Sequence, residues 1–183
     1  MSKVFAFLAD GFEEVEAIAP CDILRRGGVE VAFAGIGGQL VAGSHGIAVK
    51  ADVTVEDIDR EKLDMIVLPG GLGGVSSMEK SAAARDVIRW AWDNGKLVAA
   101  ICAAPTLLSK LGITEGKRCV CYPGLEHEMG SAKMEDAATV QDGRLLTGRG
   151  PGAAIDFGLM LLKVLRGEQA ARQVQTGMVY QNA

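Results

Sequence analysis

An apolar run that ends abruptly at a cysteine constrains the fold more than any other part of the sequence. The run Leu97–Ile101 (LVAAI) follows Gly95 and leads into Cys102, and a helix starting with a proline is expected at 105–111. Such a run is typical of a central strand in a parallel sheet. The small residues around Cys102 leave room for a tight strand-to-helix turn, the geometry of a nucleophile elbow. This turn would expose the sulfur at a helix N-terminus, where backbone N–H groups favour a thiolate.

The competing interpretation of Cys102 is structural, because free cysteines are among the most buried residues in proteins. The local sequence leaves both interpretations open.

Strand and helix patterns alternate along the rest of the chain. Apolar runs predict strands, and apolar residues at helical spacing predict helices. The helix that follows Ser81 is expected to end at Gly95. The first helix contains Pro20 and is expected to kink there. The strands are expected at 4–9, 29–34, 64–68, 97–101 and 118–122, and the helices at 13–26, 81–95, 105–111 and 153–165. Asp142-Gly143 predicts a hairpin over 138–147, and the glycine-rich stretch 35–50 a small hairpin.

This alternation predicts the α/β class, with a mostly parallel twisted sheet covered by helices on both faces, as in a flavodoxin-like (Rossmann-like) sandwich. The chain contains no internal repeat and no linker, so residues 1–183 are expected to form one domain.

Composition excludes several classes of function. The chain has 183 residues and a net charge of -4, and it contains no run of lysine or arginine, so it has no electrostatic footprint for nucleic acid. No apolar stretch approaches the roughly 18 residues that a membrane span needs, and the N-terminus lacks a signal-peptide cleavage site. Four cysteines without framework spacing suggest a reducing, cytoplasmic setting.

Several unusual segments follow the carboxyl ends of the predicted strands, where ligands bind in parallel sheets. Glu13, Glu14 and Glu16 start the first helix, and compensation of the helix dipole is sufficient to explain two of these acids. The other segments at this edge are the Gly70-Gly71 turn, the Cys102 elbow and the glycine-rich loop 148–152. The sequence therefore predicts a small-molecule pocket that brings a carboxyl group beside a thiol.

Four segments, in this order and spacing, resemble one known family: ADGFEEVEAIAPCDILRRGG, IVLPGG, LVAAICAAPTLL and LLTGRGPGAAIDFGL. The chain resembles the ThiJ/PfpI superfamily over essentially its whole length, specifically the branch of the Parkinson disease protein deglycase (DJ-one-like). The resemblance implies that Cys102 is the nucleophile and the oxidation-sensitive site, and that Glu16 is its protonated partner. It also implies a homodimer.

The resemblance implies a cofactor-independent glyoxalase or deglycase. Cys102 would attack the aldehyde of methylglyoxal or glyoxal, Glu16 would move a proton, and hydrolysis would release a 2-hydroxy acid without metal or glutathione. Backbone N–H groups of Gly71 and Ala103 are candidates for holding the oxyanion. Gly70, Tyr122, Arg149 and Pro151 are expected to complete the pocket.

Two further roles use the same pair of residues. The first is deglycation of early sugar-like adducts on proteins or nucleotides. The second is a non-enzymatic oxidative-stress sensor or chaperone, in which Cys102 becomes a sulfinic acid that Glu16 stabilises. The sequence does not separate turnover from sensing.

The chain departs from its relatives at three positions. Tyr122 stands where relatives often carry a histidine before a proline, so no imidazolium partner is available there. Ala103 stands where protease-like relatives carry a histidine, which argues against a peptidase or an amidotransferase triad. His45 aligns with an arginine that the partner subunit contributes in some relatives, and is expected at the surface or at an interface.

The remaining candidates have ordinary explanations. His127 between two glutamates is expected in a solvated surface cluster rather than at a metal. Cys119 and Cys121, on one strand face, and Cys21, on the first helix, are expected in the core. Arg149 is expected to brace the pocket wall or the dimer. The glycine-rich turns match neither a P-loop nor the dinucleotide fingerprint.

Overall fold

A mostly parallel sheet forms the centre of the molecule, which is described here by a computed structural model covering residues 3–181. The sheet is seven-stranded in the order β10-β11-β7-β6-β1-β2-β5, and every neighbouring pair is parallel except β10 with β11. The strands are β1 Lys3–Leu8, β2 Glu30–Gly35, β5 Val53–Thr54, β6 Leu63–Leu68, β7 Leu97–Ile101, β10 Thr139–Asp142 and β11 Leu145–Gly148. The predicted fold class is confirmed.

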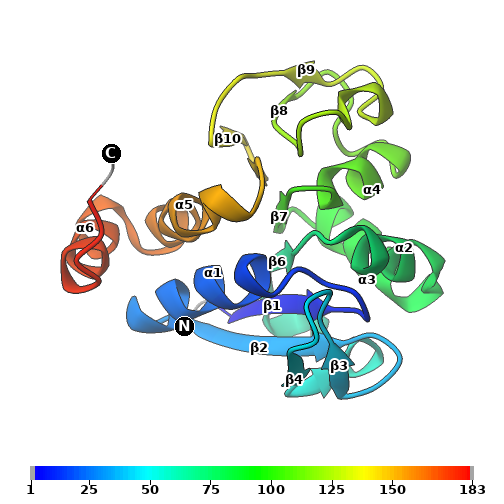
Figure 1. The fold of residues 1–183 in the computed structure, drawn as a ribbon, viewed down its shortest axis with the longest axis horizontal. Coiled ribbons are helices and arrows are strands. Elements are labelled where there is room, and N and C mark those ends of the chain that lie inside the picture. Colours follow the sequence, from blue (N-terminus) through cyan, green and yellow to red (C-terminus); the bar gives the residue numbers. More distant parts are fainter. Residues whose placement is uncertain (1–2, 182–183) are drawn as a thin grey trace.

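Helices cover both faces of this sheet, because the chain leaves β1 in one direction and β6 in the other. The step from β1 to β2 and the step from β6 to β7 run toward opposite edges, and right-handed crossovers then place the connecting helices on opposite faces. Figure 1 shows α1, α5 and α6 toward the left and α2, α3 and α4 toward the right. The helices are α1 Glu14–Arg26, α2 Leu72–Lys80, α3 Ala82–Asp93, α4 Ala104–Lys110, α5 Ala154–Arg166 and α6 Glu168–Gly177.

Short elements complete the chain. They are the hairpin β3 Leu40–Ala42 and β4 Ala48–Lys50, the pair β8 Arg118–Cys119 and β9 Lys133–Met134, and the 3-10 turns Val55–Asp57, Arg60–Lys62, Glu126–Glu128 and Pro151–Ala153. The predicted strand 118–122 is correct only for its first two residues, as β8. After β8 the chain turns toward the main sheet, where the Val120 amide donates to Thr147 Oγ1 at 3.0 Å.

Two helices were not predicted from the sequence. α2 begins LGGV, and glycine disfavours helix formation by about 1 kcal/mol per residue. Its glycines are required by packing, because a Cβ at Gly74 would lie 2.8 Å from Phe12 Cα. α6 contains few apolar residues, and Ala171 is its one buried residue. α1 runs through Pro20 as one helix.

The strand order reverses between β1 and β6, which makes this the switch point where ligands bind in such sheets. The chain that leaves β1 starts α1, the chain that leaves β6 is the Gly70-Gly71 turn, and β7 beside them ends at Cys102. The fold therefore brings the three predicted segments to one edge. No helix within residues 3–181 is long and apolar enough to cross a membrane.

Candidate active site

Cys102 occupies the sharp turn that the sequence predicts. Its φ is 64°, which lies in the left-handed region that side chains other than glycine rarely adopt. Hydrogen bonds hold both sides of its peptide, because its amide donates to Gly148 O at 2.9 Å and its carbonyl accepts from the Tyr122 amide at 2.8 Å. The residue is 8% exposed, and it lines an open cleft. The strained turn thus presents the sulfur to a cleft rather than sealing it in the core.

Glu16 lies next to this turn, in the first part of α1, and is fully buried. Its Oε2 accepts a hydrogen bond of 2.8 Å from the Gly70 amide. Its Oε1 has no hydrogen-bond partner among residues 3–181. A buried polar atom without a partner costs free energy, so this oxygen is a place where a proton or a reacting group gains a contact.

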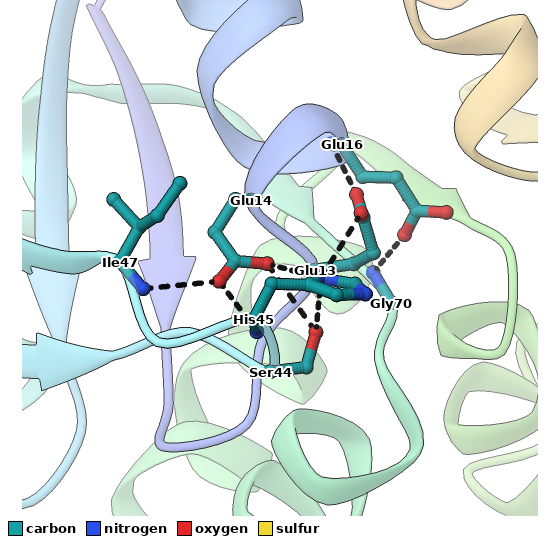
Figure 2. Close-up of polar contacts among 7 residues, drawn as sticks. All are labelled: Glu13, Glu14, Glu16, Ser44, His45, Ile47 and Gly70. Carbon is teal, nitrogen blue, oxygen red and sulfur yellow. Dashed lines mark hydrogen bonds and ion pairs between the residues drawn. The ribbon is translucent and has the colours of Figure 1, made fainter.

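Gly70 brings the thiol and the carboxyl group together because it has no side chain. A Cβ at this position would lie 2.6 Å from Cys102 Cβ and 2.6 Å from Glu16 Oε2. Both groups therefore border the same small space above the Gly70 backbone. Figure 2 shows Glu16 reaching from α1 to the Gly70 amide.

Burial changes the acidity of both groups. Desolvation raises the pKa of Glu16 to about 7, against the neighbouring Cys102 thiol and Gly70 amide, which favour the carboxylate. Desolvation also raises the pKa of Cys102 to about 12, together with the negative charge of Glu16 and its hydrogen bond. Hydrogen bonds from the amides of Gly71 and Ala103 act in the opposite direction and are outweighed. Burial and the charge of Glu16 thus disfavour the thiolate that the helix N-terminus by itself would favour.

Most of the predicted pocket residues line one cleft of about 560 Å³. Gly71, Ala103, Tyr122 and Pro151 border it together with Cys102. Glu16 and Gly70 do not border this cleft, and they are joined to each other by the hydrogen bond from the Gly70 amide to Glu16 Oε2.

Arg149 is the predicted pocket residue that lies outside this cleft. It borders a neighbouring hollow of about 380 Å³ that shares Tyr122, Pro123 and Pro151 with it. The guanidinium pairs with the exposed carboxylate of Asp136 at 2.6 Å. The predicted bracing role fits this placement, and direct contact with a molecule bound at the sulfur does not.

The loop 43–47 forms a wall of the cleft that the sequence did not reveal. Ser44 and His45 line the cleft, and the buried Glu14 carboxylate holds them from behind (Figure 2). Glu14 Oε1 accepts from the His45 amide at 2.7 Å and from the Ile47 amide at 3.4 Å. Glu14 Oε2 lies 3.3 Å from Ser44 Oγ and 2.9 Å from His45 Nδ1. Glu14, one of the three acids at the start of α1, thus anchors a loop.

The charge of Glu14 follows from these contacts. Burial by itself would raise its pKa, but hydrogen bonds from the His45 side chain and from the amides of His45 and Ile47 lower the pKa to about 2. The same contact raises the pKa of His45. Because Glu14 is ionised, His45 Nδ1 carries a proton and donates a hydrogen bond to the carboxylate.

Comparison with known proteins agrees with this geometry. Residues 2–164 match the profile of the DJ-1/PfpI family. The chain belongs to the DJ-1/PfpI family. Protein dj-1beta of Drosophila melanogaster is 39% identical over 183 residues, which covers 98% of each chain. Its crystal structure superposes with a TM-score of 0.95 over 100% of both chains, at 37% identity.

Two further relatives mark the branch of the family. The Parkinson disease protein 7 homolog of Danio rerio is 34% identical over 182 residues, covering 97% of this chain and 96% of that one. A protein of Caenorhabditis elegans named glutathione-independent glyoxalase DJR-1.2 is 33% identical over 159 residues, covering 86% and 84%. The family to which the chain belongs therefore includes a protein named as an enzyme.

The other candidates in this member of the DJ-1/PfpI family have the expected ordinary roles. His127 is exposed, and its Nδ1 lies 3.0 Å from Gly124 O. The cysteines other than Cys102 are buried and free: Cys21, Cys119 and Cys121.

Glu13, Glu14 and His45 each offer a ligand atom within 4.8 Å of the others. The oxygens of Glu14 already accept hydrogen bonds from the loop, so this group is explained by the anchoring of the loop.

Proposed function

We propose that the protein is a cofactor-independent glyoxalase or deglycase, which converts small 2-oxoaldehydes such as methylglyoxal and glyoxal into 2-hydroxy acids. One observation carries the proposal: the Cys102 thiol lines an open cleft, and the buried Glu16 carboxyl group lies beside Cys102 at Gly70. A nucleophile and a proton carrier in direct contact are what this chemistry needs.

The first step is addition of the thiol to the aldehyde. The Cys102 sulfur forms a bond to the aldehyde carbon while Glu16, as the carboxylate, accepts the thiol proton. Glu16 then delivers this proton to the former carbonyl oxygen, and a hemithioacetal results. The raised pKa of Glu16, about 7, suits a group that both accepts and donates a proton near neutral pH. The amides of Gly71 and Ala103, which lower the pKa of the Cys102 thiol, would stabilise negative charge on the oxygen.

The second step moves hydrogen within the substrate. Glu16 removes the proton from the carbon that carries sulfur, and the hydroxyl proton on that carbon passes to the ketone oxygen. Glu16 then returns the first proton to the neighbouring carbon, so that the former ketone becomes an alcohol and the carbon bound to sulfur becomes the carbonyl of a thioester. Water hydrolyses the thioester to the 2-hydroxy acid and restores the thiol. No external oxidant or reductant enters the balance, because one carbon is oxidised and its neighbour reduced. Attack on the early adducts of proteins or nucleotides would start in the same way.

Lactate formation from methylglyoxal by metal-stripped protein tests this proposal. We expect turnover in the wild type and its loss in Cys102→Ser and in Glu16→Gln. Cys119→Ser serves as a control for a buried thiol outside the cleft. Full turnover in either Cys102→Ser or Glu16→Gln would contradict the mechanism.

A second candidate function uses oxidation of the same sulfur. Cys102 borders the cleft, whereas Cys21 and Cys119 do not, so small oxidants reach Cys102 selectively. Peroxide would convert the thiol to a sulfenic acid and water, and a second peroxide would give a sulfinic acid. Protein without lactate activity, whose Cys102 alone gains oxygen under mild peroxide, would favour this oxidative-stress sensor or chaperone over the enzyme.

We also propose that the protein is a cytoplasmic homodimer. Val15 and Ile18 on α1 are 50% and 39% exposed, and Ile47 in the loop that Glu14 anchors is 59% exposed, so this side of the molecule offers apolar surface to a second copy of the chain. Four free cysteines fit a reducing compartment. Sedimentation should give twice the chain mass of 19.2 kDa, and the chain mass at all concentrations would contradict the dimer.

A further inference from the structure

The cleft at Cys102 is much larger and more apolar than a three-carbon ketoaldehyde requires. Its volume of about 560 Å³ lies in the range of pockets that bind ligands of drug size. Side chains with apolar surface border it on the side of the 122–125 turn and of α2: Leu72, Tyr122, Pro123, Leu125 and Pro151. A group beyond methyl on the substrate would therefore find apolar contact.

Leu72 is the clearest of these side chains. It is 75% exposed, although it is a large apolar residue at the start of α2. It directly follows Gly71, and both residues line the cleft together with Cys102. Exposed apolar surface in such a place marks a binding site.

The 122–125 turn is tied to the same reacting residue. The Tyr122 amide donates to Cys102 O at 2.8 Å, and the Leu125 amide donates to Tyr122 O at 3.1 Å. Tyr122 is 47% exposed, and Leu125 packs partly against the core. Hydrogen bonds therefore hold the backbone of this turn beside Cys102, and a wall that is held in place is what selectivity for a substituent requires.

Charge around the cleft disfavours anionic substituents. Glu13 lines the cleft, and Glu16 and Glu14 lie behind its wall. The lining residues include neither lysine nor arginine, and the one histidine among them, His45, is paired with Glu14. These acids would repel a phosphate or carboxylate on the substrate, and the lining residues offer no unpaired cation to bind it. A neutral apolar group would not be repelled.

We propose that Leu72 and Leu125 are specificity-determining residues and that the cleft prefers 2-oxoaldehydes with an aryl or branched alkyl substituent over methylglyoxal. This inference rests on the proposed function, and the bonds made and broken at Cys102 are the same. The reacting carbons lie at the sulfur, and the substituent lies against Leu72 and the 122–125 turn. Removal of one apolar contact of this kind changes selectivity by about 10-fold or more.

The test compares kcat/KM for methylglyoxal, 4-methyl-2-oxopentanal and phenylglyoxal in the wild type, Leu72→Ser and Leu125→Ser. Leu40→Ser is the matched control, because Leu40 is 74% exposed and does not line the cleft. We expect the ratio of each larger substrate to methylglyoxal to fall about 10-fold in Leu72→Ser and in Leu125→Ser, and to stay unchanged in Leu40→Ser. Because each ratio is compared with that of the wild type, differences in intrinsic reactivity cancel.

The outcomes separate the two proposals. Turnover of methylglyoxal that depends on Cys102, with unchanged ratios in Leu72→Ser, would overturn the specificity inference alone. Turnover that survives in Cys102→Ser would overturn the proposed function itself. Leu72 is mostly exposed, so its variant folds and decides the question even where Leu125→Ser is destabilised.

Discussion

The Gly70 amide donates a hydrogen bond of 2.8 Å to Glu16 Oε2. The space beside the Gly70 Cα is too small for any side chain, because a Cβ there would lie 2.6 Å from the same oxygen. The same backbone turn leads to Gly71, which lines the cleft together with Cys102 and whose amide lowers the pKa of the Cys102 thiol. Two consecutive glycines thus connect the proton carrier to the nucleophile. Their absence of side chains is part of the active-site geometry rather than of the turn alone.

Replacement of Gly70 by alanine should separate the two groups. The new Cβ would lie 2.6 Å from both Cys102 Cβ and Glu16 Oε2, so at least one of them must move by a large fraction of an ångström. A displacement of this size costs about 100-fold in rate when the geometry is productive. We expect kcat for methylglyoxal to fall by about this factor in Gly70→Ala. Gly177→Ala is the control, because a Cβ there meets nothing within 4 Å, and equal activity of both variants would contradict the geometric role.

The pH dependence of turnover should follow Glu16. The pKa of Glu16 is raised to about 7, so the group is protonated below this pH and cannot accept the thiol proton. We therefore expect kcat/KM to rise about tenfold per pH unit below pH 7 and to level off above it. A rate that falls as Glu16 loses its proton would show instead that the neutral carboxyl group is the reactive form.

The stability that Glu16 contributes to the folded protein should fall as pH rises, whereas turnover should rise with pH. Its pKa in the folded protein is above the value of 4.5 that applies to an unburied glutamate. The folded state therefore binds the proton more tightly, and the stability from this group is complete below pH 4.5 and is lost as pH rises through about 7. Thermal unfolding of Glu16→Gln should lack this loss between pH 4.5 and pH 7, and a slope equal to that of the wild type would contradict it.

The elbow and the parallel sheet follow from local signals in the sequence, and the acidity of the site does not. The apolar run before Cys102 and the small residues around it predict the strand, the turn and the helix correctly. The pKa of Cys102 depends on burial and on the charge of Glu16, which belongs to a distant segment of the chain. A helix N-terminus alone predicts a thiolate, and these two opposing effects outweigh it.

The anchored loop was missed for a similar reason. Glu14 and His45 are far apart in the sequence, and no local pattern joins them. One signal was present, because dipole compensation explained only two of the three acids that start α1. An acid without a local explanation is a reason to look for a distant donor, and the amide groups of the glycine-rich loop are that donor.

Glu14 should control both stability and the shape of the cleft wall. Its hydrogen bonds to the loop lower its pKa from 4.5 to about 2, so stability from this group is present above pH 4.5 and is lost as pH falls through 2. Glu14→Gln should lower the free energy of unfolding at neutral pH by about 2 kcal/mol and should weaken this acid dependence. It should also raise KM more than it lowers kcat, because the loop bearing His45 borders the cleft but not the sulfur. Glu56→Gln, at an exposed position, is the control, and equal stability of both variants would contradict the anchoring role.

The left-handed conformation of Cys102 should be measurable as strain. A φ of 64° costs an ordinary residue roughly 1–2 kcal/mol, and glycine avoids this cost because it has no Cβ. We therefore expect Cys102→Gly to be more stable than Cys102→Ala by about 1 kcal/mol in chemical unfolding. The same pair of substitutions at Cys21, inside α1, should give the reverse order, because glycine weakens a helix relative to alanine by about 1 kcal/mol. If alanine were the more stable residue at both positions, the left-handed conformation of Cys102 would carry no measurable strain.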